Sequence, residues 1–252
     1  MSQNPRPPRA GRTIVAPAFD PMVQPVVAGP VLQPLSAASL QLGFIRQAFR
    51  RPVQWQVEPV FNGSFDKDFS HRTDVIQAAV FFPLIERPSG LHVLFTRRAS
   101  HLYDHAGQIS FPGGRIEDSD RDAIAAALRE TYEEIGVDPQ FIQLIGTQPS
   151  YLTSTRFTMK PVIGQILPGF TITPDLTEVA EVFEVPLSVL MDTSIHRLHK
   201  ARLPDGGHRY YFSITWHSYF IWGATAALIR NFYHYLAAAQ MELQGPVHRG
   251  GH

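Results

Sequence analysis

The stretch that decides the fold is DHAGQISFPGGRIEDSDRDAIAAALRETYEEIGV, which occupies residues 104–137. A Phe-Pro-Gly-Gly turn precedes an alanine-rich run, and that run ends in closely spaced glutamates. Ile124, Leu128 and Ile135 recur at helical spacing, so we expect a helix over residues 120–135 with one apolar side. Charged residues make up only 17% of the chain, so this concentration of carboxylates requires a physical explanation.

Three glutamates project from neighbouring positions of that helix. Glu130 lies three residues before Glu133 and four before Glu134, so the carboxylates share a face. Like charges at this spacing repel by roughly a few tenths of a kcal/mol per pair, and the C-terminal end of a helix disfavours negative charge. A divalent cation would resolve the conflict. With no cysteine in the chain, oxygen ligands favour Mg²⁺ or Mn²⁺ over zinc. The alternative is a solvated acidic helix face.

Glycines and an arginine flank the glutamates. Gly113 and Gly114 form a tight turn whose missing side chains let backbone groups approach a metal or a phosphate, and Gly113 is a candidate substrate contact. Arg129 directly precedes the first glutamate and can orient a carboxylate through paired hydrogen bonds. This combination favours a metal site over a plain acidic surface.

The same residues resemble the Nudix box, whose pattern is G-x5-E-x7-R-E-U-x-E-E-x-G-U with U aliphatic. Gly114 opens the match, and RETYEEIGV over residues 129–137 supplies its second half. Three departures are visible. Asp120 stands where the family usually has glutamate. The spacing from Asp120 to Arg129 is one residue longer than in the family pattern, and Tyr132 occupies an aliphatic position.

The resemblance implies a fold, an activity and residue roles. The implied fold is an α/β/α sandwich with a mixed sheet, in the α/β class. The implied activity is hydrolysis of a diphosphate linked to another moiety. Glu130 and Glu134 would be the principal Mg²⁺ or Mn²⁺ ligands, with Glu133 assisting in binding and catalysis and Gly114 lending its carbonyl. Arg129 would orient the glutamates during catalysis.

An upstream segment resembles the additional signature of the coenzyme A pyrophosphatase subgroup, roughly L-L-T-x-R-[SA]-x3-R-x3-G-x3-F-P-G-G. The segment is LFTRRASHLYDHAGQISFPGG, residues 94–114. The matching positions are Leu94, Thr96, Arg98, Ala99, Gly107, Phe111, Pro112, Gly113 and Gly114. Phe95 and Tyr103 depart from the pattern, whereas IWGATA at residues 221–226 is similar to a late segment of the same proteins. The resemblance implies cleavage of coenzyme A, or its thioesters, to 3′,5′-ADP and 4′-phosphopantetheine.

The signature segment also supplies candidate substrate contacts. Arg97 and Arg98 close a strand beside the glycine turn, where guanidinium groups can grip phosphates. Tyr103 can stack on adenine or hydrogen-bond a phosphate but brings no charge, and His105 and Gln108 are further candidates. Two structural alternatives stay open: Arg97 covers a sheet edge, and His105 holds its loop through a hydrogen bond.

A general base, or a residue that holds the attacking water, is also required. TPDLTEVAEVFEVPL contains Glu178, Glu181 and Glu184 and resembles the Nudix segment from which a glutamate often returns to the metal. Glu178 is the best match, with helix capping as its alternative role.

Three other functions are weighed against cleavage of coenzyme A. Tyr103 keeps open a Nudix hydrolase of another nucleoside diphosphate derivative, such as a dinucleotide or a nucleotide sugar. A non-catalytic nucleotide-binding Nudix module has no need of the costly cluster of Arg129 and its glutamates. A structural interaction protein explains the proline-rich N-terminal residues but not the central motif.

The pattern outside the motif predicts the remaining organisation. We expect strands over residues 75–85, 91–99, 141–150, 159–167, 196–203, 208–216 and 218–222. We expect helices over residues 36–50 and 223–243, and one over at least the second half of residues 177–192. The predicted domains are a disordered proline-rich arm (1–34), a peripheral helix and linker (35–72), the Nudix domain (73–240) and a frayed tail (241–252).

Composition limits the partners. The 22 basic residues balance the 22 acidic ones, so no global field attracts nucleic acid or an acidic membrane surface. Prolines and a glycine interrupt the apolar stretch near the N-terminus, which therefore predicts no spanning helix. We expect a cytoplasmic protein. The alternative is a targeting segment, because the first residues faintly resemble a transit peptide. The expected partner is a small-molecule substrate, and the oligomeric state is not indicated.

Overall fold

The structure is a computed structural model that describes residues 19–58, 75–102, 105–153, 156–203 and 206–244. Its helices are η1 (Ala37–Leu40), α1 (Leu42–Phe49), α3 (Ala123–Ile135), η3 (Pro139–Phe141), α4 (Leu187–Leu190), η4 (Thr193–Ile195) and α5 (Gly223–Gln244). Its strands are β1 (Val26–Val27), β2 (Ile76–Arg87), β3 (Gly90–Arg98), β4 (Ile109–Ser110), β5 (Gly113–Arg115), β6 (Ile142–Thr147), β7 (Tyr151–Leu152), β8 (Phe157–Ile166), β9 (Val179–Pro186), β10 (His196–Arg202), β11 (His208–Trp216) and β12 (Tyr219–Trp222).

The central sheet is mixed, as predicted. Its main path runs β4-β3-β2-β8-β6, and β5, β7 and β9 pair with β2, β8 and β3 respectively. β2 runs parallel to β8, with Phe81 opposite Val162, and antiparallel to β3, with Leu84 opposite Val93. The long apolar run of β2 fits a strand covered on both faces.

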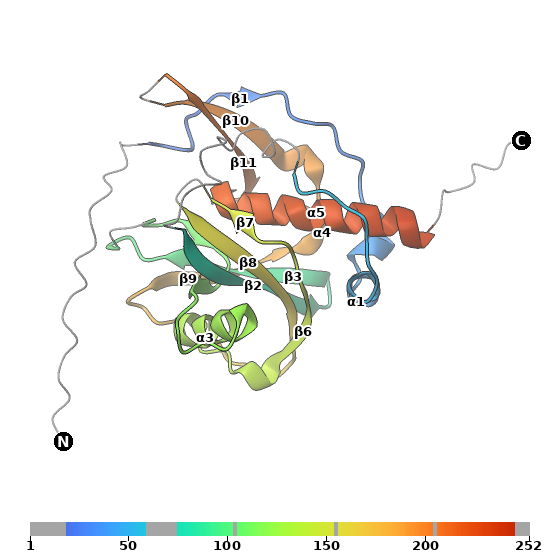
Figure 1. The fold of residues 1–252 in the computed structure, drawn as a ribbon, viewed down its shortest axis with the longest axis vertical. Coiled ribbons are helices and arrows are strands. Elements are labelled where there is room, and N and C mark those ends of the chain that lie inside the picture. Colours follow the sequence, from blue (N-terminus) through green and yellow to red (C-terminus); the bar gives the residue numbers. More distant parts are fainter. Residues whose placement is uncertain (1–18, 59–74, 103–104, 154–155, 204–205, 245–252) are drawn as a thin grey trace, which may run out of the picture.

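The two faces of this sheet belong to different hydrophobic cores. Phe81 and Ile85 of β2 pack in the core that contains Ala126 of α3. The alternate residues Val80, Phe82 and Leu84 pack in the core that contains α5. Because neighbouring strand residues point to opposite faces, this division places α3 and α5 on opposite sides of the sheet (Figure 1). The result is the predicted α/β/α sandwich.

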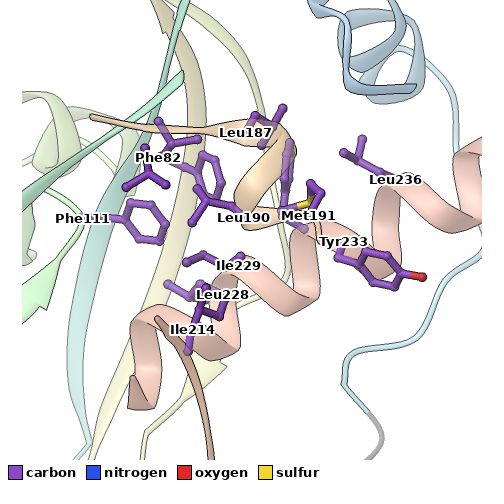
Figure 2. Packing of buried hydrophobic residues seen from close by; sticks show 14 of the residues in the cluster. Phe82, Phe111, Leu187, Leu190, Met191, Ile214, Leu228, Ile229, Tyr233 and Leu236 are labelled. Atoms are coloured by element: carbon purple, nitrogen blue, oxygen red, sulfur yellow. The ribbon is translucent and has the colours of Figure 1, made fainter. Parts of the chain in front are cut away.

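A second sheet, with strand order β1-β10-β11-β12, packs against the other side of α5 (Figure 1). Its neighbouring strands are all antiparallel. The strands expected after residue 195 therefore form this separate layer instead of joining the central sheet, because β10, β11 and β12 satisfy one another across short turns. Figure 2 shows Ile214 of β11 beside Leu228 and Ile229 of α5, with Phe82 and Phe111 beyond them.

Two predicted helices need correction. α3 begins at Ala123 and not at residue 120, because the Asp122 side chain accepts a hydrogen bond from the Ala125 amide and caps the helix. The helix expected over at least the second half of residues 177–192 is found there but is limited to Leu187–Leu190, and residues 179–186 form strand β9. Pairing of β9 with β3 fixes this valine-rich segment as a strand.

The predicted disordered arm is also corrected for residues 19–34. Val26 and Val27 form β1, which pairs with β10, and the Tyr211 hydroxyl donates to the Pro21 carbonyl at 2.6 Å. Residues 1–18, 59–74 and 245–252 lie outside the described part, whereas α5 extends through 241–244 of the predicted frayed tail. Within the described residues, none of the helices combines the length and apolar character that a membrane crossing requires.

Candidate active site

Helix α3 presents its last turns to the glycine turn. Asp122 caps its start, and Gly136, at φ 73°, ends it in the left-handed conformation that suits glycine. Ala126 and Ala127, one to two turns before Glu130 and Glu134 on the same side of the helix, are buried against the sheet. The small alanines allow this close approach, which brings Glu130 and Glu134 up to β5.

The glycines of β5 leave room for those carboxylates. A Cβ on Gly114 would lie 2.5 Å from both Cδ and Oε1 of Glu130, so the carboxylate sits directly against the backbone. A Cβ on Gly113 would lie 2.4 Å from the Ala79 carbonyl oxygen, and its φ of 152° disfavours other residues. Gly113 therefore requires glycine, whereas a side chain at position 114 would displace the Glu130 carboxylate from the β5 backbone.

Arg129 joins three carboxylates. Its Nε and Nη2 donate to the two oxygens of Asp120 at 3.0 and 2.8 Å. Its Nη1 donates to Glu130 Oε1 at 2.9 Å and to Glu133 Oε2 at 3.0 Å. The hydrogen bond with Arg129 lowers the pKa of Asp120. Asp120, which replaces the usual glutamate, therefore anchors the arginine that holds Glu130 and Glu133.

Glu134 is the buried member of the cluster, with 5% of its surface exposed. Burial and the nearby Glu130 carboxylate raise the pKa of Glu134 to about 8. Arg98 and a 3.4 Å hydrogen bond from the Gly113 amide act in the opposite direction. Burial likewise raises the pKa of Glu130, despite its bond to Arg129. Glu130 and Glu134 are thus two carboxylates whose negative charge the surrounding residues do not fully compensate.

Glu178 lies close enough for its charge to raise the pKa of both Glu130 and Glu134. It precedes β9 on the exposed surface, and its carbonyl accepts a hydrogen bond from the Ala99 amide at 2.8 Å. Its predicted alternative role, helix capping, does not apply, because β9 follows it. Among the described residues, the carboxylates gathered here outnumber the guanidinium groups of Arg98 and Arg129.

The candidate ligands of the site are oxygen atoms, which suit a hard divalent cation. Their side chains are not arranged around a common metal position. Among the described residues, no three His, Asp or Glu side chains stand in a geometry ready to hold a metal ion. Glu130 and Glu133 instead turn toward Arg129. The buried Glu134 carboxylate and the all-oxygen donor set nevertheless match Mg²⁺ or Mn²⁺.

The two candidate arginines of β3 have different surroundings. Arg98 acts electrostatically on Glu134, and its buried Nε has no hydrogen-bond partner among the described residues. Arg97 instead pairs with Glu181, with Nε 3.4 Å from Oε2, and lies over the ring of Tyr219. Of the two arginines, Arg98 is thus the one that lies at the carboxylate cluster.

The other predicted substrate contacts are His105 and Tyr103, with Gln108 as a further candidate. His105 is exposed, adopts φ 59°, and its Nδ1 lies 2.7 Å from Oε1 of Gln108. This contact matches the loop-holding alternative. Tyr103 lies outside the described residues. Tyr219 was missed by the sequence interpretation, because only tertiary structure brings it to Arg97.

Comparison with known proteins identifies the class. The NUDIX domain family profile matches residues 75–202. The relative named "Uncharacterized Nudix hydrolase NudL" from Enterobacter sp. (strain 638) is 42% identical over 157 residues, which cover 62% of this chain and 80% of that protein. Its counterpart from Escherichia coli (strain K12) is 40% identical with the same coverage. A solved Nudix hydrolase from M. smegmatis, RenU, is 22% identical with a TM-score of 0.40, covering 46% of this chain and 74% of its own.

An α/β/α sandwich that carries a glutamate-rich helix against a glycine turn defines a Nudix-type protein. The chain belongs to the NUDIX domain family. Hydrolysis at a pyrophosphate bond, with a divalent metal ion, is the activity that this membership supports.

Proposed function

We propose that this protein hydrolyses the diphosphate bond of coenzyme A, and of its thioesters, with Mg²⁺ or Mn²⁺. The products are 3′,5′-ADP and 4′-phosphopantetheine. Family membership supports the reaction type. The choice of coenzyme A depends on the signature-like segment at residues 94–114, which precedes the family-wide motif and shares only Gly114 with it.

One observation carries this choice. The two segments that resemble coenzyme A pyrophosphatases meet at residues 108–109, where the Gln108 carbonyl accepts a hydrogen bond from the Arg98 amide. The Thr225 hydroxyl donates to the Ile109 carbonyl at 3.0 Å. A Cβ on Gly223 would lie 3.8 Å from Nε2 of Gln108. Residues 221–226 therefore support the loop that connects Arg98 to the glycine turn.

The described residues have separate roles in the proposed reaction. Arg98 binds a phosphate of the substrate through its guanidinium group, whose buried Nε lacks a hydrogen-bond partner among the described residues. Arg129 holds Glu133 and, through Asp120, keeps a fixed position on α3. When bound, the metal ion neutralises phosphate charge and lowers the pKa of the attacking water. Glu178 or Glu133 accepts the proton of that water as a new P–O bond forms and the bridging P–O bond breaks.

The test is a substrate panel. The full chain is incubated with Mg²⁺ or Mn²⁺ and coenzyme A, an acyl-coenzyme A, NADH, ADP-ribose or diadenosine tetraphosphate, and products are separated by chromatography. We expect 4′-phosphopantetheine from coenzyme A with the highest kcat/KM. Turnover of no member under any metal condition would contradict hydrolysis and favour a nucleotide-binding module.

A second candidate is hydrolysis of another nucleoside diphosphate derivative. Tyr103 favours it, because the coenzyme A signature has an arginine at that position and a tyrosine brings no positive charge. The same panel discriminates: a higher kcat/KM for ADP-ribose, NADH or the dinucleotide would replace coenzyme A as the substrate.

A further inference from the structure

The loop between β8 and β9 is hydrogen-bonded to the C-terminal end of α3 and leads into Glu178. The Thr173 amide donates to the Ile135 carbonyl at 2.8 Å, and the Asp175 amide donates to the Glu134 carbonyl at 2.9 Å. These bonds satisfy carbonyl groups that the end of a helix leaves without a partner inside the helix. The loop is therefore tied to the backbone of Glu134 shortly before it reaches Glu178.

Packing also holds this loop against α3. A Cβ on Gly136 would lie 2.9 Å from Thr173 Cβ and 3.0 Å from the Thr173 carbonyl oxygen, so a side chain at position 136 would displace the loop. Phe170 and Ile172 pack against the hydrophobic core that contains Ile135. The glycine that ends the helix thus also makes room for the loop.

The Asp175 side chain shapes the turn that carries Glu178. Its Oδ1 accepts from the Thr177 amide at 2.9 Å and from the Thr177 hydroxyl at 2.7 Å. Its carbonyl accepts from the Glu178 amide at 3.0 Å and from the Val179 amide at 2.8 Å. Asp175 therefore bonds to the end of α3 through its amide, and to the turn of Glu178 through its side chain and its carbonyl.

Folding stability alone does not explain why this turn is fixed. Asp175, Thr177 and Glu178 are exposed, and a hydrogen bond contributes only about 0.5–1.5 kcal/mol net to folding. The turn keeps Glu178 where its charge raises the pKa of Glu130 and of Glu134, which is an unfavourable interaction in the chain alone. A divalent cation bound at these carboxylates makes the same proximity favourable.

We propose that Asp175 is a positioning residue, which holds Glu178 beside the glutamates of α3 so that its carboxylate acts at the same divalent cation. This inference rests on the proposed function, because Glu178 is there a candidate acceptor for the proton of the attacking water. Asp175 acts only through Glu178, since Thr177 occupies its carboxylate. Displacement of Glu178 should therefore weaken metal binding and slow proton transfer, whereas the grip of Arg98 on a phosphate should persist.

Binding of Mn²⁺ tests the proposal without hydrolysis. Asp175→Ala removes the acceptor of both Thr177 bonds, whereas Asp175→Asn loses the charge and keeps an acceptor oxygen. In calorimetric titrations with Mn²⁺, Asp175→Ala should weaken binding about tenfold, as loss of a supporting contact around a metal does, and Asp175→Asn less than about twofold. Asp175→Ala added to Glu178→Gln should have no further effect, because both changes act through the same carboxylate.

The chain offers a matched control. Asp192 repeats the Asp-x-Ser/Thr turn, and its Oδ1 accepts from the Ser194 amide at 2.9 Å. It follows α4, which packs in the core on the side of the central sheet opposite to α3. Asp192→Ala should leave Mn²⁺ affinity unchanged. Unchanged Mn²⁺ affinity in Asp175→Ala, equal weakening by Asp175→Asn, or undetectable Mn²⁺ binding by the unaltered protein would overturn the proposal.

Failure of the proposed function gives a different result. With the best substrate of the panel, Asp175→Ala should lower kcat about tenfold and change KM less than about twofold. A protein that turns over no diphosphate yet loses Mn²⁺ affinity in Asp175→Ala alone keeps the positioning residue and loses the hydrolase assignment. In the reverse case, turnover of coenzyme A with unchanged kcat and Mn²⁺ affinity in Asp175→Ala keeps the hydrolase and removes the positioning role.

Discussion

Two arginine-centred networks of this molecule have opposite charge balances. Buried Arg230 of α5 donates from Nε to Glu58 at 2.6 Å, and its Nη1 lies 3.1 Å from Nδ1 of His196. His196 in turn contacts the Leu190 carbonyl through Nε2, at 2.8 Å. Arg129, which is partly exposed, instead bonds three carboxylates. Two further carboxylates, those of Glu134 and Glu178, belong to the same cluster. One network pairs its charges, and the other gathers an excess of negative charge.

The contrast separates a structural network from a functional one. Burial would raise the pKa of Glu58, but hydrogen bonds from His234 and Arg230 lower it overall. Burial lowers the pKa of His196 to about 4, so this histidine stays neutral beside Arg230. At the carboxylate cluster, burial and repulsion raise the pKa of Glu134 instead. An environment that opposes the charge of its own carboxylates favours a cation that comes from outside the chain.

The largest expected effect is on catalysis. Glu134→Gln should reduce kcat at least about 10³-fold, because it removes a charged ligand from the metal site. Folding stability should be unchanged or higher, since the amide carries no buried charge. Steady-state assays with Mg²⁺ and thermal unfolding measure both quantities. Unchanged turnover would remove Glu134 from the metal site.

The opposite pattern is expected in the Arg230 network. Glu58→Ala leaves a buried guanidinium without its carboxylate and should lower the free energy of unfolding by about 3–5 kcal/mol. Activity per folded molecule should persist, because the network is not part of the carboxylate site. Urea unfolding followed by circular dichroism provides the measurement. A loss of stability below 1 kcal/mol would contradict a structural role.

A smaller effect is expected from the anchor of Arg129. Asp120→Ala removes the bidentate partner and should lower Mg²⁺ affinity or kcat/KM about 10–100-fold, as loss of supporting contacts around a metal does. Asp120→Glu, which introduces the usual residue of the family motif, should retain most activity. Asp118→Asn changes one exposed charge nearby and serves as the control. Equal effects of Asp118→Asn and Asp120→Ala would indicate a general charge effect.

The smallest expected effect is a pH dependence of stability. The pKa of Glu134 is about 8 in the folded chain, well above the ordinary glutamate value of 4.5. Between these values the folded state binds more protons, so without metal its stability falls as the pH rises toward 8. Urea unfolding from pH 7 to 8.5, where His196 is neutral, should show this slope. Mg²⁺ should flatten it, and Glu134→Gln should lack it; a slope that persists in Glu134→Gln would assign it elsewhere.

Local chemistry explains what the sequence could predict. Arg129 and the glutamates lie on one helix, so their proximity follows from helix geometry alone. The contact of the glutamates with the glycine turn depends in addition on the packing of α3 against the sheet. A helix is expected over at least the second half of residues 177–192, but only Leu187–Leu190 are helical, because residues 179–186 pair with β3 as strand β9. Tyr219 and Glu181 meet across 38 residues, a contact that no local pattern encodes.

The burial of α5 between two sheets has a consequence for the order of folding. Ser36 and Gln240 are hydrogen-bonded partners separated by 204 residues, and the Tyr235 hydroxyl closes a similar span to the Ala48 carbonyl. Until α5 has been synthesised, the α5-facing side of the central sheet lacks its longest covering helix, and of the later elements only the short α4 packs on it. Nascent chains therefore expose Phe82 and its neighbours to chaperones, while the α3-facing side already has its own helix.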